Sequence, residues 1–262
     1  DLGVTRISLG VQSLNDMRLA FLGRTHTRQD ALRAFALLRS FGFANINVDF
    51  MYGFPQQSSA ELARDLDEVL ELGSEHVSVY SLTVEDRSLF FARKLAVDSD
   101  AQAEAYEYIR GRLAAAGLRQ YEVSNFARPG FESSHNLNYW RGGEYIGLGM
   151  AAHSYLAGRR FWSADTLPLY LRMMDEKGNA LAGEEKLEGV RKLTEVFLFG
   201  LRMNEGVDLG AWERRIGVEL PQDRKEALES FIEMGFLEET DDRIRVTDRG
   251  RLVLDEIAAR IV

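Results

Sequence analysis

Three apolar runs alternate with segments of helical periodicity in the first part of the chain. The runs are bounded by glycine, proline or polar residues, as buried strands are, and occupy 6–13, 46–55 and 76–83. The helical segments cover about 15–23, 27–42, 58–72 and 99–116. Tandem strand–helix units of this length favour parallel strands joined by right-handed crossovers. The pattern predicts an α/β fold, either a doubly wound sheet or part of a (β/α) barrel.

Two of these helices carry a start signal. Thr27 is followed three residues later by Asp30, and Ser58 by Glu61. This is the spacing of a capping box, in which the side chains at the two positions satisfy each other's free backbone N–H groups. Both pairs therefore predict the first turn of a helix.

The pattern of residue types changes after residue 120. Glycines crowd 121–162 with little helical periodicity, which predicts strands and loops folded over one end of the sheet. Helical segments follow at about 167–177, 185–203, 208–216 and 223–234. A strand, turn and strand over 235–250 and a last helix from Arg251 complete a winged-helix-like pattern. We therefore divide the chain into a sheet region (1–120), a glycine-rich extension (121–165) and a helical C-terminal domain (166–262).

Composition narrows the class of protein. The 262 residues carry a formal charge of −9, which disfavours nucleic acid as a partner because phosphate binding needs clustered Lys and Arg. No run approaches the roughly 20 apolar residues of a membrane span, so we expect a cytoplasmic protein. The chain has no cysteine and begins at Asp1 within the approach to a strand. We expect it to be a fragment without thiolate ligands of its own.

Polar side chains stand where the predicted strands end. Gln12 follows the first strand, Asp49 interrupts the second, Thr83 ends the third, and Arg24 lies beyond the first short helix. Ligands of parallel α/β folds gather at the carboxyl ends of strands, where these groups would suit a nucleoside joined to an amino acid. Alternatively, Asp49 caps a helix, Arg24 forms a surface pair and Gln12 satisfies loop backbone.

Five ordered segments resemble one known family. They are "ISLGVQSLNDMRLAFLGRTHT", "INVDFMYGFPQQS", "SVYSLT", "YEVSNFARPGFESSHNLNYW" and "YIGLGMAAHSYL". Together they resemble the radical S-adenosylmethionine proteins of the oxygen-independent coproporphyrinogen III oxidase family, and above all its HemW branch, described as haem chaperones. The resemblance extends over almost the whole chain.

The resemblance implies the C-terminal part of a partial (β/α) TIM-like barrel, followed by a helical domain. In the family the barrel mouth holds a [4Fe–4S] cluster and S-adenosylmethionine. The contacts with S-adenosylmethionine carry over to Gln12, Arg24 and Asp49, with Met51 and Thr83 as weaker candidates. The family's CxxxCxxC loop has no counterpart here, so the chain is expected to be catalytically silent alone and to expose the strand "RISLGV" as a barrel edge.

The stretch "HNLNYW" (135–140) matches the HNxxYW pattern that this branch links to haem binding. The resemblance makes His135 the candidate axial ligand of the haem iron and Tyr139 and Trp140 candidate aromatic contacts. Alternatively, Asn136 and Asn138 bond loop backbone while the two rings pack in a core.

The other histidines carry weaker signals. His153, with Gly147 and Gly149, is a candidate for lining a pocket, although glycines at such a turn also permit close backbone approach. His26 precedes a helix and His76 enters a strand, so both are expected to be structural.

Two functions remain open. The first is a haem chaperone that binds haem or porphyrin, with haem-accepting apoproteins and peripheral association with a membrane as further partners. The second is oxidative decarboxylation of coproporphyrinogen III. A DNA-binding role is disfavoured, because the predicted recognition helix 223–234 has four acidic and two basic side chains.

Overall fold

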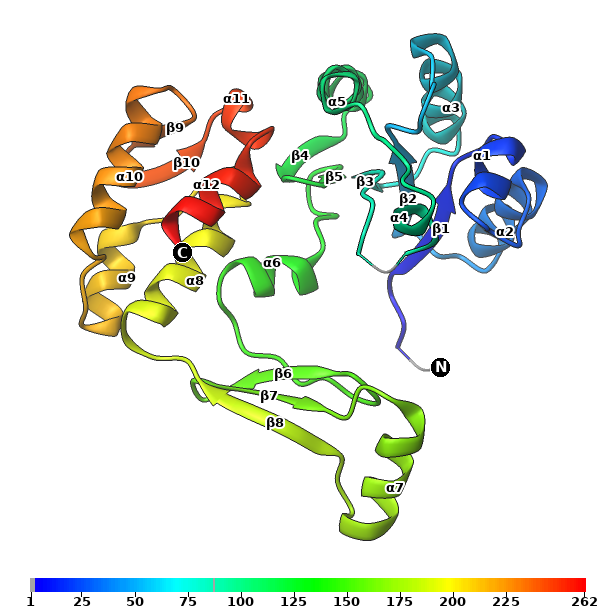
Figure 1. The fold of residues 1–262 in the computed structure, drawn as a ribbon. Coiled ribbons are helices and arrows are strands. Elements are labelled where there is room, and N and C mark those ends of the chain that lie inside the picture. The colour runs from blue at the N-terminus through cyan, green and yellow to red at the C-terminus, as the bar shows by residue number, and fades with distance from the viewer. Residues whose placement is uncertain (1–2, 87) are drawn as a thin grey trace. The chain divides into compact units, whose positions relative to one another are not determined.

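The computed structural model describes residues 3–86 and 88–262, so Asp1, at the expected fragment start, lies outside the described residues. The chain divides into two compact units, Asp1–Glu132 and Ser133–Val262 (Figure 1). The boundary falls inside the glycine-rich extension predicted from the sequence.

The N-terminal unit is built on one five-stranded sheet. Its elements are β1 (Ile7–Gln12), α1 (Asp16–Phe21), α2 (Arg28–Ser40), β2 (Ile46–Tyr52), α3 (Ser59–Glu71), β3 (His76–Ser81), α4 (Leu89–Ala92), α5 (Ser99–Ala115), β4 (Arg119–Glu122) and β5 (Asn125–Ala127). The strand order is β1-β2-β3-β5-β4. The first three strands are parallel, as predicted, and β5 and β4 add an antiparallel hairpin. Among the described strands, β1 pairs with β2 alone and is an edge.

The two faces of this sheet differ in chemistry. Val48 and Phe50 of β2 and Val77 of β3 belong to one buried apolar cluster with Leu66 of α3 and Ile109 of α5. Helices α2, α3 and α5 all lie on this side of the sheet (Figure 1). Side chains alternate along a strand, so the intervening residues of β2 and β3 point to the opposite face. That opposite face, here called the inner face, is polar.

The two predicted capping boxes have different outcomes. Thr27 and Asp30 form the complete reciprocal box at the start of α2. Ser58 accepts a hydrogen bond from the Glu61 N–H, but the Glu61 carboxylate binds Arg18 instead of returning to the cap. The second prediction is therefore half correct, because a tertiary ion pair competes for the acidic side chain.

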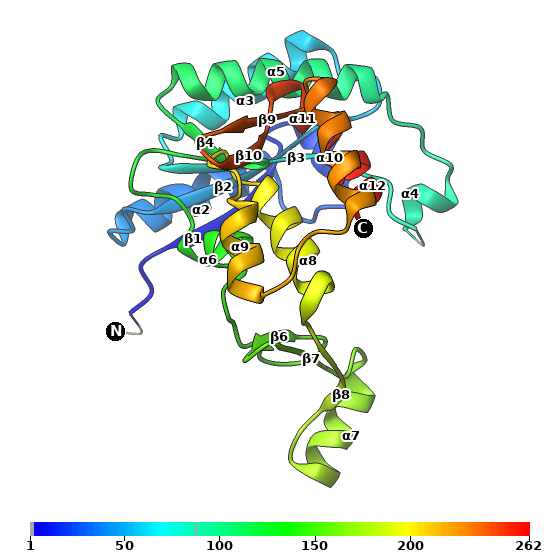
Figure 2. The same ribbon diagram turned by 90° about the vertical axis from the view of Figure 1, so that its left-hand side faces the viewer.

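The C-terminal unit combines a small sheet with a group of helices (Figure 2). Its elements are α6 (Ser134–Trp140), β6 (His153–Leu156), β7 (Arg159–Ser163), α7 (Leu167–Lys177), β8 (Leu181–Lys186), α8 (Gly189–Leu201), α9 (Leu209–Ile216), α10 (Gln222–Glu233), β9 (Leu237–Thr240), β10 (Arg243–Val246), α11 (Asp248–Arg251) and α12 (Leu254–Ile261). Strands β6, β7 and β8 form an antiparallel sheet. The predicted strand, turn and strand is the antiparallel hairpin β9–β10.

Two local predictions in this unit are wrong. The stretch HNLNYW lies in a helix, α6, instead of a strand or loop, and Ser133 caps it through a hydrogen bond from Asn136 N. Residues 185 and 186, expected to begin a helix, end strand β8. Glu and Lys favour helices in isolation, but pairing with β7 decides the conformation here.

Candidate functional site

A network of hydrogen bonds on the inner face is centred on Asn47 of β2. Its Oδ1 accepts from His76 Nδ1 at 2.6 Å, and its Nδ2 donates to Asp49 Oδ1 at 2.8 Å and to Ser8 Oγ at 2.5 Å. This arrangement fixes the His76 tautomer, because Nδ1 must carry the proton. Nε2 is then an acceptor, and it receives the hydroxyl proton of Tyr121 at 2.8 Å.

Burial perturbs two titratable groups of this network, His76 and Asp49. Burial and the nearby Arg6 charge lower the pKa of His76 to about 3, so the ring is neutral at physiological pH. Burial raises the pKa of Asp49, and hydrogen bonds from Asn47 and Ser78 partly offset that rise. The inner face therefore presents a partly buried carboxylate in a fixed orientation.

Gln12 lies beside Asp49 on the inner face. Its backbone is left-handed, with φ at 66°, and the β1–β2 register shifts between Gly10 and Gln12. A Cβ on Gly10 would lie 2.8 Å from Gln12 Nε2, so the amide folds back over Gly10, which pairs with Asp49. Glycine at position 10 therefore lets the amide and the carboxylate occupy neighbouring positions.

Helix α3 holds the turn that follows Gln12. The buried Asp65 accepts hydrogen bonds from Ser13 Oγ and from Leu14 N, both at 2.5 Å. One turn earlier, Glu61 forms a two-pronged ion pair with Arg18, at 2.6 and 2.8 Å. The left-handed residue is thus followed by a segment that α3 fixes at two points.

The remaining residues predicted to contact S-adenosylmethionine are more exposed to solvent than Gln12. Met51 alternates with Asp49 along the inner face and pairs in register with Tyr80 of β3. Thr83 and Arg24 are exposed, and Arg24 forms no ion pair within residues 3–86 and 88–262. None of the three alternatives is seen in the described chain, since Asp49 caps no helix, Arg24 makes no surface pair and Gln12 satisfies no loop backbone group.

The second candidate site lies on α6 in the C-terminal unit. The rings of His135 and Tyr139 meet edge to face, with centroids 4.7 Å apart and planes at 85°. Tyr139 in turn meets Tyr145 at 4.5 Å. His135 is exposed, and no described residue forms a hydrogen bond with its imidazole. The ring is therefore supported by an aromatic contact while its nitrogens are available to a ligand.

Trp140 faces a different side of the same helix. It lies five positions after His135, which places the two side chains about 140° apart around the helix axis. Its ring packs on Phe199 of α8 at 5.9 Å, and the Arg202 guanidinium lies 4.6 Å from the ring centre. The indole Nε1 is buried without a hydrogen-bond partner among the described residues. The motif therefore combines the exposed imidazole of His135 with the ring of Trp140, which packs inside the C-terminal unit.

Close contacts with neighbouring oxygen atoms account for two glycines near these residues. Asn138 Nδ2 donates to Glu144 O at 2.9 Å, and a Cβ on Gly143 would lie 2.1 Å from Asn138 Oδ1. A Cβ on Gly147 would lie 2.2 Å from His153 O. His153 itself is exposed, stacks on Trp162 at 5.7 Å and lines an open groove with Tyr145 and Arg160.

The donors of an iron–sulfur cluster are not provided by this chain. It contains no cysteine, and no group of three or more His, Asp or Glu side chains suited to a metal ion occurs in the described part. The residues present do not fit the cluster. In the described part of the chain, no helix is both long and apolar enough to cross a bilayer.

The fold and two sequence profiles define the class of protein. The radical S-adenosylmethionine superfamily profile matches residues 1–69, and the HemN C-terminal domain profile matches residues 191–253. The solved structure of coproporphyrinogen III oxidase (HemN) from Escherichia coli, described as a radical SAM enzyme, superimposes with a TM-score of 0.83 at 22% identity, over 99% of this chain and 64% of that one. These matches define a radical SAM fold with a HemN-type C-terminal domain.

Curated relatives give the particular family. The chain is 33% identical to the heme chaperone HemW of Bacillus subtilis over 260 residues, which cover 97% of this chain and 69% of the relative. It is 37% identical to HemW of Lactococcus lactis (95% and 67%) and 36% identical to HemW of Escherichia coli (97% and 68%). The chain belongs to the HemW family of radical SAM proteins, as its motifs predicted. It spans about two thirds of the length of these relatives.

Proposed function

We propose that this chain is part of a haem chaperone and that α6 presents His135 to the haem iron. The proposal rests on one observation: the His135 ring is exposed and makes no hydrogen bond to any described residue. A neutral imidazole is the commonest protein ligand of haem iron. The relatives that match this chain over most of its length are named heme chaperones, which supports the same function.

Each residue of the motif has a separate task in this proposal. The His135 nitrogen donates its lone pair to the iron of the bound cargo. Tyr139 limits rotation of the imidazole through the edge-to-face contact. Trp140 holds α6 against α8 and does not stack on the cargo, because Phe199 and Arg202 already contact its ring.

The inner face of the N-terminal unit is proposed to hold S-adenosylmethionine, the cofactor implied by the radical SAM family. When bound with its cluster, this cofactor supplies radical chemistry. Asp49 would accept hydrogen bonds from the ribose hydroxyls, and the Gln12 amide would bond a neighbouring polar group. Arg24, Met51 and Thr83 are proposed as further contacts. This chain has no thiolate and so supplies no cysteine ligand to that cluster.

The two alternative functions have less support. The likeness to coproporphyrinogen III oxidase is at 22% identity and defines the fold only. A DNA-binding role is opposed by α10, where the acidic side chains outnumber the basic ones. Haem-accepting apoproteins and a membrane surface remain proposed partners of the chaperone.

A haem titration tests the assignment of His135. We expect His135→Ala to shift the Soret band and to weaken haem binding at least tenfold. His26→Ala is the control, because it removes a histidine of the N-terminal unit that lies outside the proposed haem site and bonds Val11 O. It should leave the Soret spectrum and the haem affinity unchanged. Identical spectra and affinities for His135→Ala and the native chain would refute the axial-ligand assignment.

A further inference from the structure

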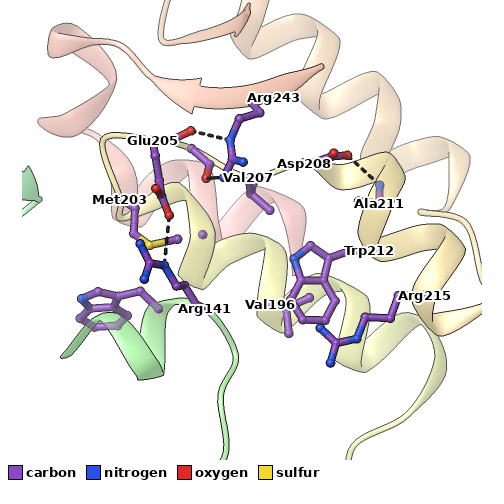
Figure 3. Close-up of a pocket in the computed structure, with 13 residues that line it drawn as sticks. Arg141, Val196, Met203, Glu205, Val207, Asp208, Ala211, Trp212, Arg215 and Arg243 are labelled. Atoms are coloured by element: carbon purple, nitrogen blue, oxygen red, sulfur yellow. Dashed lines mark hydrogen bonds and ion pairs between the residues drawn. The ribbon is translucent and has the colours of Figure 1, made fainter. Parts of the chain in front are cut away.

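A pocket of about 380 Å³ lies within the C-terminal unit, between α6, α8, α9 and β10 (Figure 3). Its apolar wall is formed by Val196, Val207 and Trp212, together with Trp140 from the motif. Two of the three tryptophans of the chain thus line one cavity. Its volume lies in the range of about 300–1,000 Å³ that is typical of sites for small molecules.

Most charged groups at this pocket already have partners. Arg141 forms an ion pair with Glu205 at 3.2 Å, and Arg243 donates to the Glu205 carbonyl at 2.8 Å (Figure 3). Asp208 accepts a hydrogen bond from Ala211 N at 2.7 Å, as the cap of α9. These contacts hold these charged side chains at the pocket edge in place and leave none of them available to bind a charged ligand.

Arg215 is the exception among the lining residues. Its guanidinium lies 4.8 Å from the centre of the Trp212 ring, and no carboxylate of the described residues pairs with it. Figure 3 shows Arg215 beside Trp212, away from the group formed by Arg141, Glu205 and Arg243. An arginine held on an aromatic face keeps its donors free to bind an anion in a fixed direction.

We propose that this pocket binds a planar aromatic carboxylate of one or two rings. The ring would pack against Trp212 and the apolar wall, and the carboxylate would accept paired hydrogen bonds from Arg215. Stacking of aromatic rings and a charge-assisted hydrogen bond at the edge of an apolar pocket reinforce each other. A neutral ring would lose the second contact and a cationic ring would be repelled.

The site is distinct from the proposed haem ligand. Trp140 contributes to the pocket, whereas His135 and Tyr139 lie on another side of α6. The inference therefore does not rest on the proposed chaperone function. A tetrapyrrole also carries carboxylates on a flat ring, so the experiment must separate the two kinds of ligand.

Calorimetric titration with naphthylacetate and naphthylacetamide tests the proposal, because these probes share a ring and differ in charge. We expect naphthylacetate to bind at least tenfold more tightly than the amide. Arg215→Ala should abolish that difference. Arg214→Ala is the matched control, since Arg214 is on the same helix but does not line the pocket, and it should preserve the difference. Equal affinities of the two probes in the native chain, absence of binding, or equal effects of the two variants would overturn the proposal.

Two further variants refine the test. One separates the loss of charge from the loss of packing, and the other separates this pocket from the proposed haem site. Arg215→Met keeps an unbranched chain over Trp212 and removes only the charge, so it should lower naphthylacetate affinity without changing the melting temperature. His135→Ala, and saturation of the native chain with haem, should leave naphthylacetate binding unchanged. Displacement of the probe by haem would overturn the inference of a separate site, and the haem titration of His135→Ala would still test the chaperone proposal.

Discussion

Asp65 on α3 accepts a hydrogen bond from the hydroxyl of Ser13 at 2.5 Å, and so ties the helix to the residue that follows the left-handed Gln12. The same carboxylate accepts from Leu14 N at 2.5 Å. A single buried side chain thereby sets where the end of β1 turns. This relationship links the stability of the sheet to the position of a residue proposed to contact S-adenosylmethionine.

We predict that Asp65→Ala lowers the free energy of unfolding by about 3 kcal/mol, because it leaves a buried hydroxyl and a backbone N–H without their acceptor. Asp65→Asn should cost about 1 kcal/mol or less, since an amide can accept from Leu14 N and donate to Ser13 Oγ. Urea denaturation followed by far-ultraviolet circular dichroism measures both. Asp67→Ala is the control, because Asp67 forms a half-exposed pair with Arg112 and should cost less than about 1 kcal/mol.

The charge of Asp65 also predicts a pH effect. Burial raises the pKa of this carboxyl, so the folded state binds its proton more tightly than the unfolded chain. Its contribution to stability is therefore full below the unfolded pKa of about 3.9 and is lost as the pH rises through the folded pKa. In Asp65→Asn this decline should be smaller than in the native chain. An unchanged profile between the two proteins would contradict the prediction.

His76 predicts a pH effect of opposite sign. Its folded pKa is about 3, whereas an unfolded histidine titrates near 6.5. The unfolded chain therefore takes up a proton that the folded protein excludes, and stability falls as the pH decreases from 6.5 toward 3, by up to about 1.4 kcal/mol per pH unit. We expect His76→Gln to reduce this dependence of the free energy of unfolding on pH, as measured by urea unfolding between pH 4 and 7. A pH slope in His76→Gln equal to that of the native chain would contradict the prediction.

The two ends of the motif should respond differently to truncation. Trp140→Ala removes the packing on Phe199 and the contact with Arg202, so we predict a loss of about 2 kcal/mol. His135→Ala removes an exposed ring and should change stability by less than about 0.5 kcal/mol while altering the haem spectrum. Thermal unfolding with parallel Soret spectra separates these effects. Equal stability losses in both variants would show that the motif acts as one packing unit.

Gly147 is predicted to be the least replaceable glycine of the loop before β6. A methyl group there would lie 2.2 Å from His153 O, so Gly147→Ala must displace the backbone and should cost more than about 2 kcal/mol. Gly149 has open space around it but a φ of +97°, and Gly149→Ala should cost only about 1 kcal/mol. Melting temperatures of the two variants provide the comparison.

Strong local patterns were sufficient for much of the fold. The apolar runs at 46–55 and 76–83 are buried strands with their ends within a few residues of the predicted positions. The complete capping box at Thr27 marks the start of α2 as predicted. These elements could be recognised because burial, periodicity and capping all favour the same local conformation.

Other elements depended on distant partners. The strand β8 consists largely of residues that favour helices, and it is extended because β7 supplies its hydrogen bonds. The polar HNLNYW stretch has no apolar periodicity, yet Ser133 and the packing of Trp140 on α8 make it helical. Sequence patterns on a short segment do not contain the partners that decide these cases.

The candidate sites divide in the same way. The order of motifs along the sequence by itself indicated the family and the choice of His135, Gln12 and Asp49 as candidate site residues. The composition alone showed that the chain has no thiolate. Only the tertiary structure decided that His76 orients Asn47 beside Asp49, that Trp140 turns away from His135, and that Arg215 is left without an acidic partner among the described residues. Residue identity limits the available chemistry, but burial, orientation and pairing arise from strands and helices that are far apart in the chain.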